Sequence, residues 1–301
     1  MPDRKGNQIK VIRPCCLLGR RPKRRPGRQK LPFWAIFAAV ALLPAASGAE
    51  SAESSAAVAL TPHSAHYGVA LKSARSGSSI QSAHGDMIVS WEGDCAGWTM
   101  TYRLVFDVGY TGGRVVRISV DAATWEARNG GRYNFTSRTS FDDREAERVE
   151  GHAVRTPELN EAHFTSPTRK TIALPSDTIF PTRHTEMILE AARAGRRIVP
   201  ATLFDGFAPD GAQFVNAVIG PEIPAEPGSA KAFADLARHP MWRVRLAFFD
   251  GDAQRTEPAS EVGMDLYANG VTARLDLDFG DFAIRSALQK LELIPRPVCR
   301  D

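Results

Sequence analysis

The clearest pattern in this chain is the alternation of apolar and polar residues. From Trp98 to Tyr110, in WTMTYRLVFDVGY, every second residue is apolar, while most residues between them are Thr, Arg, Asp or Gly. Successive side chains of a strand point to opposite faces, so this stretch predicts a long strand with one buried face. Residues 241–252, MWRVRLAFFDGD, repeat the pattern, with Arg243 and Arg245 on the polar side.

Two more alternating runs flank Asn269-Gly270 in GMDLYANGVTARLDLDFG, residues 263–280. Asn-Gly tolerates positive φ at both central positions, so a two-residue type I′ hairpin turn is expected here. Shorter runs with the same period lie at residues 85–91, 114–120, 133–137, 162–166, 214–219 and 282–293. Most of the chain beyond residue 62 is therefore expected to be antiparallel strand.

One segment has a helical period instead, in FPTRHTEMILEAARAGRRIV, residues 180–199. Its apolar residues recur at helical spacing, at Met187, Ile188, Ala191 and Ala192. We expect a helix that is capped by Thr182, carries Glu186 in its first turn and ends at Gly195. A second, shorter helix is expected in SAKAFADLARHP, residues 229–240, ending before Pro240.

A single amphipathic helix among many strands favours one architecture. The expected fold is mainly β, of the α+β class, with one curved antiparallel sheet or open barrel wrapped around the helix. Residues 63–301 are expected to form a single domain of this kind. No internal repeat of 20 to 50 residues is visible, which disfavours a propeller or a solenoid.

The first 49 residues have the three parts of a secretory signal. A basic stretch, RPKRRPGRQK, precedes the apolar LPFWAIFAAVALLP and the small residues of AASGAESAES. Cleavage is expected near Ala49, followed by a flexible linker over residues 50–62. The alternative is a membrane anchor, but the apolar core, residues 31–43, is shorter than the roughly 20 residues of a spanning helix. Export with cleavage is the prediction.

The charge of the chain divides at the same point. Residues 1–49 carry eleven Lys or Arg and one acidic residue, a net charge of +10, so the remaining residues carry −6 of the total of +4. The basic character therefore belongs to the leader. A nucleic-acid-binding surface is not predicted.

Removal of the leader also removes Cys15 and Cys16, so the mature chain keeps only Cys95 and Cys299. Two cysteines in an oxidising compartment predict a disulfide, and two buried free thiols are the alternative. Closing so long a loop stabilises a protein by at most about 5 kcal/mol on the chain-entropy account.

The histidines and the Asp-Gly pairs form no recognisable metal motif. The seven histidines are His63, His66, His84, His152, His163, His184 and His239. Their spacing gathers no ligand set, and the HxxH of His63 and His66 lies in a segment that need not be helical. Asp205 and Asp210 are each followed by Gly, but apolar residues fill the positions where a calcium loop needs oxygen ligands. Two turns are expected there, and no metal site is predicted.

Catalytic and cofactor-binding motifs are missing from the sequence. It has no GxSxG, no Walker loop and no GxGxxG after a strand. The acid pairs Asp142-Asp143 and Asp276/Asp278 are expected on turns or exposed strand faces. A glycosidase-like carboxylate pair is not excluded, but nothing selects one. No catalytic residue and no cofactor is predicted.

Two features fit a binding function as well as a structural role. Arg243 and Arg245, on one strand face, are suited to an anion, although solvated strand faces carry such residues without a ligand. Met187, Ile188 and Leu189 are suited to lining a lipid cavity. A helix that covers the core of a sheet has the same sequence.

Several stretches, taken in order, are similar to one family. They are GDCAGWTM, TWEA from Thr124 to Ala127, LPSDTIFPTRHTEMILEAARAG, TLFDGFAPDGAQFVNAVIG and the closing KLELIPRPVC. The ordered set resembles the cell envelope integrity family represented by EipB, from Gram-negative periplasms, over about His63 to Cys299. The long basic leader and the connector PEIPAEPGSAKAFADLARHP depart from the family pattern.

The resemblance implies a fold, a disulfide and a function. The implied fold is a β-spiral, an open curved sheet around a helix, similar in outline to periplasmic lipoprotein carriers. The implied disulfide joins Cys95 and Cys299. The implied function is non-enzymatic support of the envelope under stress, together with a periplasmic tetratricopeptide-repeat protein. A carrier of a lipid or acyl chain is the alternative, and an enzyme acting on the cell wall is the third possibility.

Overall fold

The computed structural model describes residues 58–207, 210–226, 233–249 and 257–299, and one 15-stranded sheet contains every strand in them. Besides the sheet, the described residues form the α-helix α1 (Pro181–Arg193) and the 3₁₀ turn η1 (Leu236–Arg238). The strands are β1 (His63–Ala74), β2 (Ile80–Gly93), β3 (Gly97–Tyr110), β4 (Val115–Ala127), β5 (Arg132–Phe141), β6 (Arg144–Arg155), β7 (Asn160–Ser166), β8 (Lys170–Ala173), β9 (Thr178–Ile179), β10 (Ile198–Leu203), β11 (Gln213–Ile223), β12 (Met241–Phe249), β13 (Ser260–Tyr267), β14 (Thr272–Asp278) and β15 (Phe282–Leu293).

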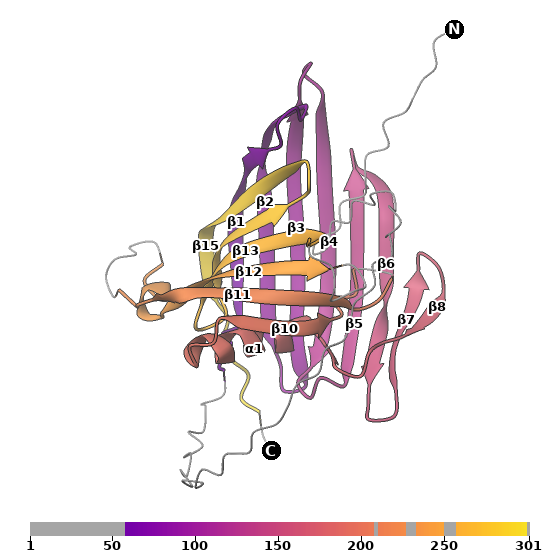
Figure 1. Ribbon diagram of the computed structural model, residues 1–301, viewed down its shortest axis with the longest axis vertical. Helices are drawn as coiled ribbons and strands as arrows, with labels where there is room; N and C mark the ends of the chain where they lie inside the picture. The colour runs from indigo at the N-terminus through magenta and orange to yellow at the C-terminus, as the bar shows by residue number, and fades with distance from the viewer. Residues whose placement is uncertain (1–57, 208–209, 227–232, 250–256, 300–301) are drawn as a thin grey trace, which may run out of the picture. The chain divides into compact units, whose positions relative to one another are not determined.

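The sheet is a meander whose first and last strands meet in its middle. Its order runs from β8 back to β1, passes to β15, and continues back to β9. All pairings are antiparallel except that of β9 with β10, which are joined through α1. The two edges, β8 and β9, are separated in sequence only by residues 174–177. In Figure 1, β3–β6 run vertically and β10–β13 run horizontally, so the sheet is strongly twisted and open.

The alternation predicted from the sequence sets the two faces of the sheet. In β4, Val116, Ile118 and Val120 are at most 2% exposed, while of the residues between them Arg117 is exposed and Ser119 is partly exposed. The long strand expected from Trp98 to Tyr110 is β3, which begins one residue earlier. The mainly β, open antiparallel architecture is confirmed.

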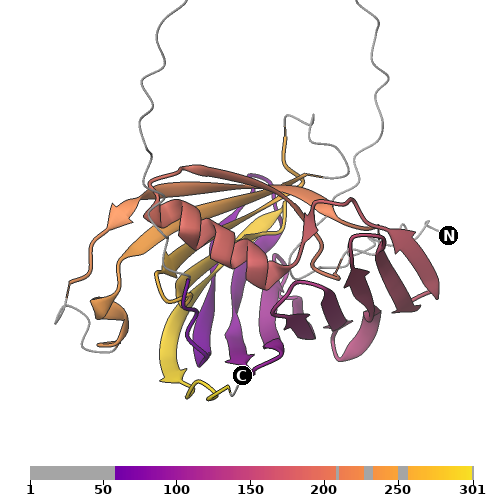
Figure 2. The same ribbon diagram turned by 90° about the horizontal axis from the view of Figure 1, so that it is seen from below.

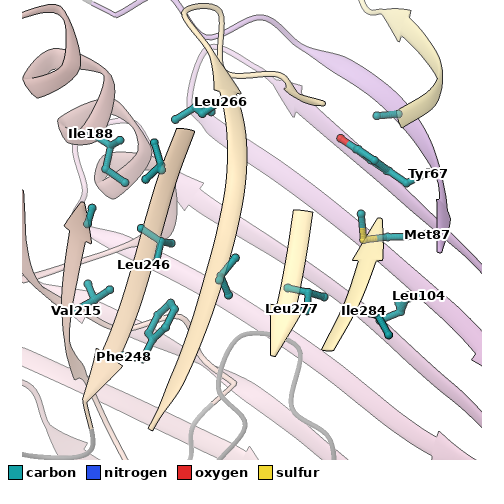
Figure 3. Packing of buried hydrophobic residues seen from close by; sticks show 14 of the residues in the cluster. Tyr67, Met87, Leu104, Ile188, Val215, Leu246, Phe248, Leu266, Leu277 and Ile284 are labelled. Atoms are coloured by element: carbon teal, nitrogen blue, oxygen red, sulfur yellow. The ribbon is translucent and has the colours of Figure 1, made fainter. Parts of the chain in front are cut away.

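The helix α1 fills the inner face of the sheet. It packs on β10 and β11, and Figure 2 shows it alongside these strands, on their side toward β1–β3. Ile188 and Leu189 are 2% and 0% exposed and belong to one apolar core that includes residues of both halves of the sheet. Figure 3 shows Ile188 near Leu246 on β12, with Tyr67 and Met87 from the other half across the same core. Burying one such side chain stabilises the fold by roughly 1.5–3 kcal/mol.

A second, aromatic core joins the two ends of the sheet. Tyr133 on β5 stacks on Phe180, which precedes α1, with ring centroids 5.0 Å apart. The Tyr133 hydroxyl donates a hydrogen bond to the carbonyl oxygen of Asp205, at 2.9 Å. Phe164 and Phe204 are 1% and 0% exposed in the same cluster. Side-chain packing, rather than a hydrogen-bonded ladder, therefore holds the β5–β7 region against the segments beside β9 and β10.

The hairpin turn at Asn269-Gly270 is longer than expected. Four residues separate β13 from β14, and only Gly270 has positive φ, at 88°. The Gly270 N–H donates to the carbonyl oxygen of Tyr267, which is typical of a type I turn followed by a left-handed Gly. The hairpin is confirmed, but the type I′ prediction was wrong. Positive φ at two adjacent residues occurs instead at Gly112-Gly113, with 90° and 82°, and at Asp142-Asp143, with 49° and 61°.

The start of α1 differs from the prediction. The N-cap residue of α1 is Phe180, so Thr182 lies inside the first turn and makes no cap, and Glu186 lies beyond that turn. The end of α1 is as expected: Arg193 is the last helical residue, Ala194 is the C-cap, and Gly195 stops the helix with φ of 70°. Of the second helix, the described residues contain only η1, because Pro240 holds His239 in an extended conformation directly after it.

The folded region begins before residue 63. Leu60 is 3% exposed in the main core, and the Thr61 N–H donates to the carbonyl oxygen of Asn269 at 2.8 Å. The expected linker over residues 50–62 is therefore too long at its carboxyl end, since an apolar residue there finds a buried place. Residues 1–57, with the expected signal and the cleavage near Ala49, lie outside the described residues. No helix in the described part has the length and apolar character needed to cross a bilayer.

Candidate functional site

A carboxylate from the sheet caps the amino end of α1. Glu126, near the end of β4, is 4% exposed. Its Oε2 accepts a hydrogen bond from the backbone N–H of Thr182 at 2.7 Å, and its Oε1 accepts one from Arg183 at 3.0 Å. The first N–H groups of a helix lack partners inside the helix and carry partial positive charge. Glu126 satisfies both requirements and fastens α1 to β4.

The amino end of α1 carries two groups with displaced pKa values. Burial raises the pKa of Glu126 to about 7, against the opposing effect of the two backbone donors. Burial lowers the pKa of His184, which is 3% exposed, to about 4. Such shifts are frequent at catalytic sites. Here both Glu126 oxygens bind helix backbone and the side chain is closed to solvent, so its geometry is that of a structural cap.

Cys95 and Cys299 form a disulfide with their Cα atoms 5.5 Å apart. Cys95 lies in the turn between β2 and β3, and Cys299 is the last described residue of the tail that follows β15. The same tail is held to the start of the fold: Ile294 N–H donates to the Pro62 carbonyl oxygen at 2.9 Å, and Arg296 donates to that of Leu60 at 2.8 Å. The pairing is the one that composition and the family resemblance predict.

The acid pairs noted in the sequence have structural positions. Asp142 and Asp143 form the β5–β6 turn. Asp276 is partly buried, which by itself would raise its pKa, but hydrogen bonds from Arg285 and Lys72 outweigh burial and lower the pKa to about 2. Asp278 accepts a bond from the Gly280 N–H in the next turn. These acids therefore support turns and ion pairs, and none is paired with a second carboxylate in a cleft.

The histidines and Asp-Gly pairs noted in the sequence have other positions and contacts. Asp205 Oδ1 accepts a hydrogen bond from the Phe207 N–H at 2.9 Å, so this carboxylate forms the turn expected there. His152 and His163 stack on the outer face with ring centroids 4.9 Å apart. Across the described ranges, no three His, Cys, Asp or Glu side chains gather as metal ligands.

The outer face of the sheet is hollowed over β2–β7. Two adjoining hollows, of about 400 and 430 Å³, share Ala123 and Thr136. We call them together the outer groove. Besides these shared residues, it is lined chiefly by Ile88, Thr99, Thr101, Arg103, Asp121, Trp125, Asn134, Arg138, Arg148, Glu150 and His152. Arg243 and Arg245, on β12, lie outside it.

A family model describes residues 54–295 of this chain, under the name EipB-like. The chain belongs to the EipB-like family. The matched region covers the whole sheet, so the resemblance noted in the sequence extends over the complete fold.

One named relative and one solved structure are similar to this EipB-like chain over most of its length. It is 30% identical over 264 residues to the cell envelope integrity protein EipB of Brucella abortus (strain 2308), covering 87% of this chain and 90% of the relative. It also matches the crystal structure of a β-barrel-like protein of domain of unknown function DUF1849 from Brucella abortus. That match has a TM-score of 0.73 and 29% identity, and covers 79% of this chain and all of the other. Neither name indicates an enzymatic family.

The sequence did not reveal two parts of this EipB-like site. Glu126 stands in the TWEA stretch, at a position where the alternation of β4 places side chains on the buried face. A charged residue on a buried face needs a partner, and that was the available signal. The outer groove depends on which residues oppose one another across the six strands β2–β7, and the period within each strand does not contain that register.

Proposed function

We propose that this protein supports cell envelope integrity without catalysis, by binding a partner protein or an envelope component in the periplasm. The observation that carries the proposal is the family relationship, with a relative of nearly the same length named a cell envelope integrity protein. Export by a signal peptide cleaved near Ala49 accords with that role, as does the disulfide between Cys95 and Cys299.

The packing of the inner face favours partner binding over lipid transport. A carrier needs an open apolar cavity. Here Leu189 on α1 and Val215 on β11 are both fully buried in the main core, and Met187 packs against it. The helix thus occupies the space that an acyl chain would need, and the two hollows described above lie on the outer face.

The buried ionisable groups favour binding over catalysis. Glu126 has a raised pKa, but its oxygens are occupied by the backbone of α1. Asp276 is held ionised by Lys72 and Arg285. The partner that the family resemblance suggests is a periplasmic tetratricopeptide-repeat protein, and it remains part of the proposal.

Deletion of the gene tests this function. Loss of the protein is expected to sensitise cells to detergents and cell-wall antibiotics, and the mature protein should be recovered free in the periplasmic fraction beginning near Glu50. A Glu126→Asp variant, with a shortened cap, serves as a folding control. Normal resistance in the deletion strain would remove the envelope role, and an apolar segment retained in membranes would contradict export with cleavage.

A further inference from the structure

The outer groove has a regular floor of short side chains. Thr101 on β3 is directly opposite Ala123 on β4, which is opposite Thr136 on β5. Because opposed residues of neighbouring strands share a face, these three form one row that crosses β3, β4 and β5. On β6 the row ends with Glu150, opposite Thr136, so the floor of short side chains spans three strands. The row of short side chains is the cause of the hollow.

Longer side chains form a wall on each side of this row. On one side Arg103, Asp121, Arg138 and Arg148 are opposite one another on β3, β4, β5 and β6. On the other side Trp125, Asn134 and His152 are opposite one another on β4, β5 and β6. Each wall is two residues from the floor row, so the backbones of the walls are about 13 Å apart. That width suits an extended chain, whereas an α-helix with its side chains is about 10–12 Å across and would meet the wall side chains.

The guanidinium groups of the three arginines in the wall have N–H donors that are available to a ligand. Asp121 lies 3.4 Å from Arg103 and 3.5 Å from Arg138, and Arg148 lies 3.5 Å from Glu145. Elsewhere on the sheet, Arg117 binds Asp107 with two bonds, at 2.9 and 3.1 Å. The side chains of Arg103, Arg138 and Arg148 are 64%, 50% and 47% exposed. Their guanidinium groups are therefore presented to solvent with only long ionic contacts.

The opposite wall offers a fixed aromatic ring. The Trp125 ring packs against Gly97, where an added Cβ would lie 2.8 Å from it, so only Gly permits this contact. Tryptophan and arginine are the residue types that most often dominate binding energy at protein interfaces. This wall ends with His152, stacked on His163.

From these features we propose that the outer groove binds an extended, carboxylate-rich segment of a partner protein. The inference rests on the proposed partner-binding function and adds the chemistry of the partner. Arginine forks bind carboxylates with paired hydrogen bonds. Arginines on three strands, spaced along the wall at multiples of about 4.8 Å, match several carboxylates along one chain better than one headgroup. The positive charge of this wall also contrasts with the net charge of −6 that the residues after 49 carry.

Binding of a defined peptide to the purified, oxidised mature protein tests the proposal. The probe is a fluorescent twelve-residue peptide of alternating Glu and Thr, and the reference is the same peptide with Gln in place of Glu. Fluorescence anisotropy is expected to show binding of the Glu peptide alone, weakening as salt is added. Arg103→Gln/Arg138→Gln should reduce the affinity by about tenfold or more, because the two guanidinium groups that bind carboxylates are lost.

Two further variants separate the groove from general charge and from misfolding. Arg243→Gln/Arg245→Gln removes the same charge from β12 and should leave binding unchanged. Ala123→Gln fills the floor without altering charge and should also weaken binding, with an unchanged melting temperature. Equal binding of the Gln peptide, equal loss in the β12 variant, or no binding at all would overturn the inference. So would binding of polygalacturonate or anionic phosphatidylglycerol vesicles in place of the peptide.

Complementation distinguishes this inference from the function on which it rests. If the deletion strain is detergent-sensitive and Arg103→Gln/Arg138→Gln restores full resistance, the envelope role stands and the groove inference fails. If the deletion strain is not sensitive, the envelope role fails, whatever the peptide does. Both statements hold when the deletion is sensitive and only the β12 variant restores resistance.

Discussion

Glu126 and His184 lie at the same end of α1 but respond to pH in opposite directions. The folded pKa of Glu126, about 7, lies above its ordinary value of 4.5, so its contribution to stability is complete below 4.5 and is lost as pH rises through 7. The folded pKa of His184, about 4, lies below 6.5, so its contribution is present above 6.5 and is lost as pH falls through 4. Between these limits the two effects oppose each other.

Replacing Glu126 by Gln should expose the effect of His184. The free energy of unfolding of Glu126→Gln is expected to rise with pH between about 4.5 and 6.5 more steeply than that of the wild type. The difference between the two proteins should change by on the order of 2–3 kcal/mol from pH 4.5 to 7.5. Urea unfolding at a series of pH values measures this difference. In His184→Asn, the free energy of unfolding should instead fall with pH relative to that of the wild type. Parallel curves for all three proteins would contradict the assignment.

The β5–β6 turn offers a separate test at one residue. Asp143 has φ of 61°, a conformation that Gly adopts at little cost. Asp143→Gly is therefore expected to increase the free energy of unfolding by about 0.5–1 kcal/mol. Asp142→Gly is the comparison, because Asp142 Oδ1 accepts a hydrogen bond from the Arg117 N–H at 2.9 Å that Gly would lose. A larger gain from Asp142→Gly than from Asp143→Gly, by chemical denaturation, would go against this explanation.

At the scale of elements, the sequence predicted the strands better than their ends. The alternation in β3 and β12 marks a buried face, and a buried face is a local property of each strand. The start of α1 was misassigned because its cap, Glu126, lies 56 residues away from Thr182 in the sequence. The turn at Asn269-Gly270 was misassigned because neighbouring strands, and not the pair alone, set the turn length. The outer groove was missed since it needs the register of several strands.

The tail after β15 depends on its disulfide. Residues 294–299 form no strand, and the bond joins them to the β2–β3 turn across a sequence separation of 204 residues. Cys95→Ser, Cys299→Ser and the double variant are expected to lose similar amounts of stability, about 2–5 kcal/mol each. Reductant should lower the melting temperature of the wild type and leave that of the double variant unchanged. Free thiols, or a bond between two chains, in non-reduced peptides from exported protein would contradict the intramolecular bond.

At the scale of the whole described fold, the two cores hold different parts of the sheet together. The main core holds α1 against the sheet, and the aromatic core joins segments on either side of residues 174–177. The edges β8 and β9 are short, with four and two residues. Short edge strands limit unwanted pairing with other chains. The open sheet therefore ends in a short strand at each margin, and its hydrogen-bonded ladder does not close.

The pairing of β1 with β15 has a consequence for how the chain reaches this fold. That ladder joins His63 to Leu293, so the central pair of the sheet is also the most distant in sequence. A circular permutant that links residue 299 to residue 58 and opens the chain between Pro175 and Ser176, both exposed, would turn the sheet into an ordinary meander from β9 to β8. Every ladder would then join neighbours in sequence, which lowers the contact order. In stopped-flow refolding without the disulfide, the permutant should fold faster than the cysteine-free natural chain. A permutant opened at the β5–β6 turn, which separates two strands that pair as neighbours in sequence, should gain less. Equal folding rates for all three would mean that formation of the central pair does not limit folding.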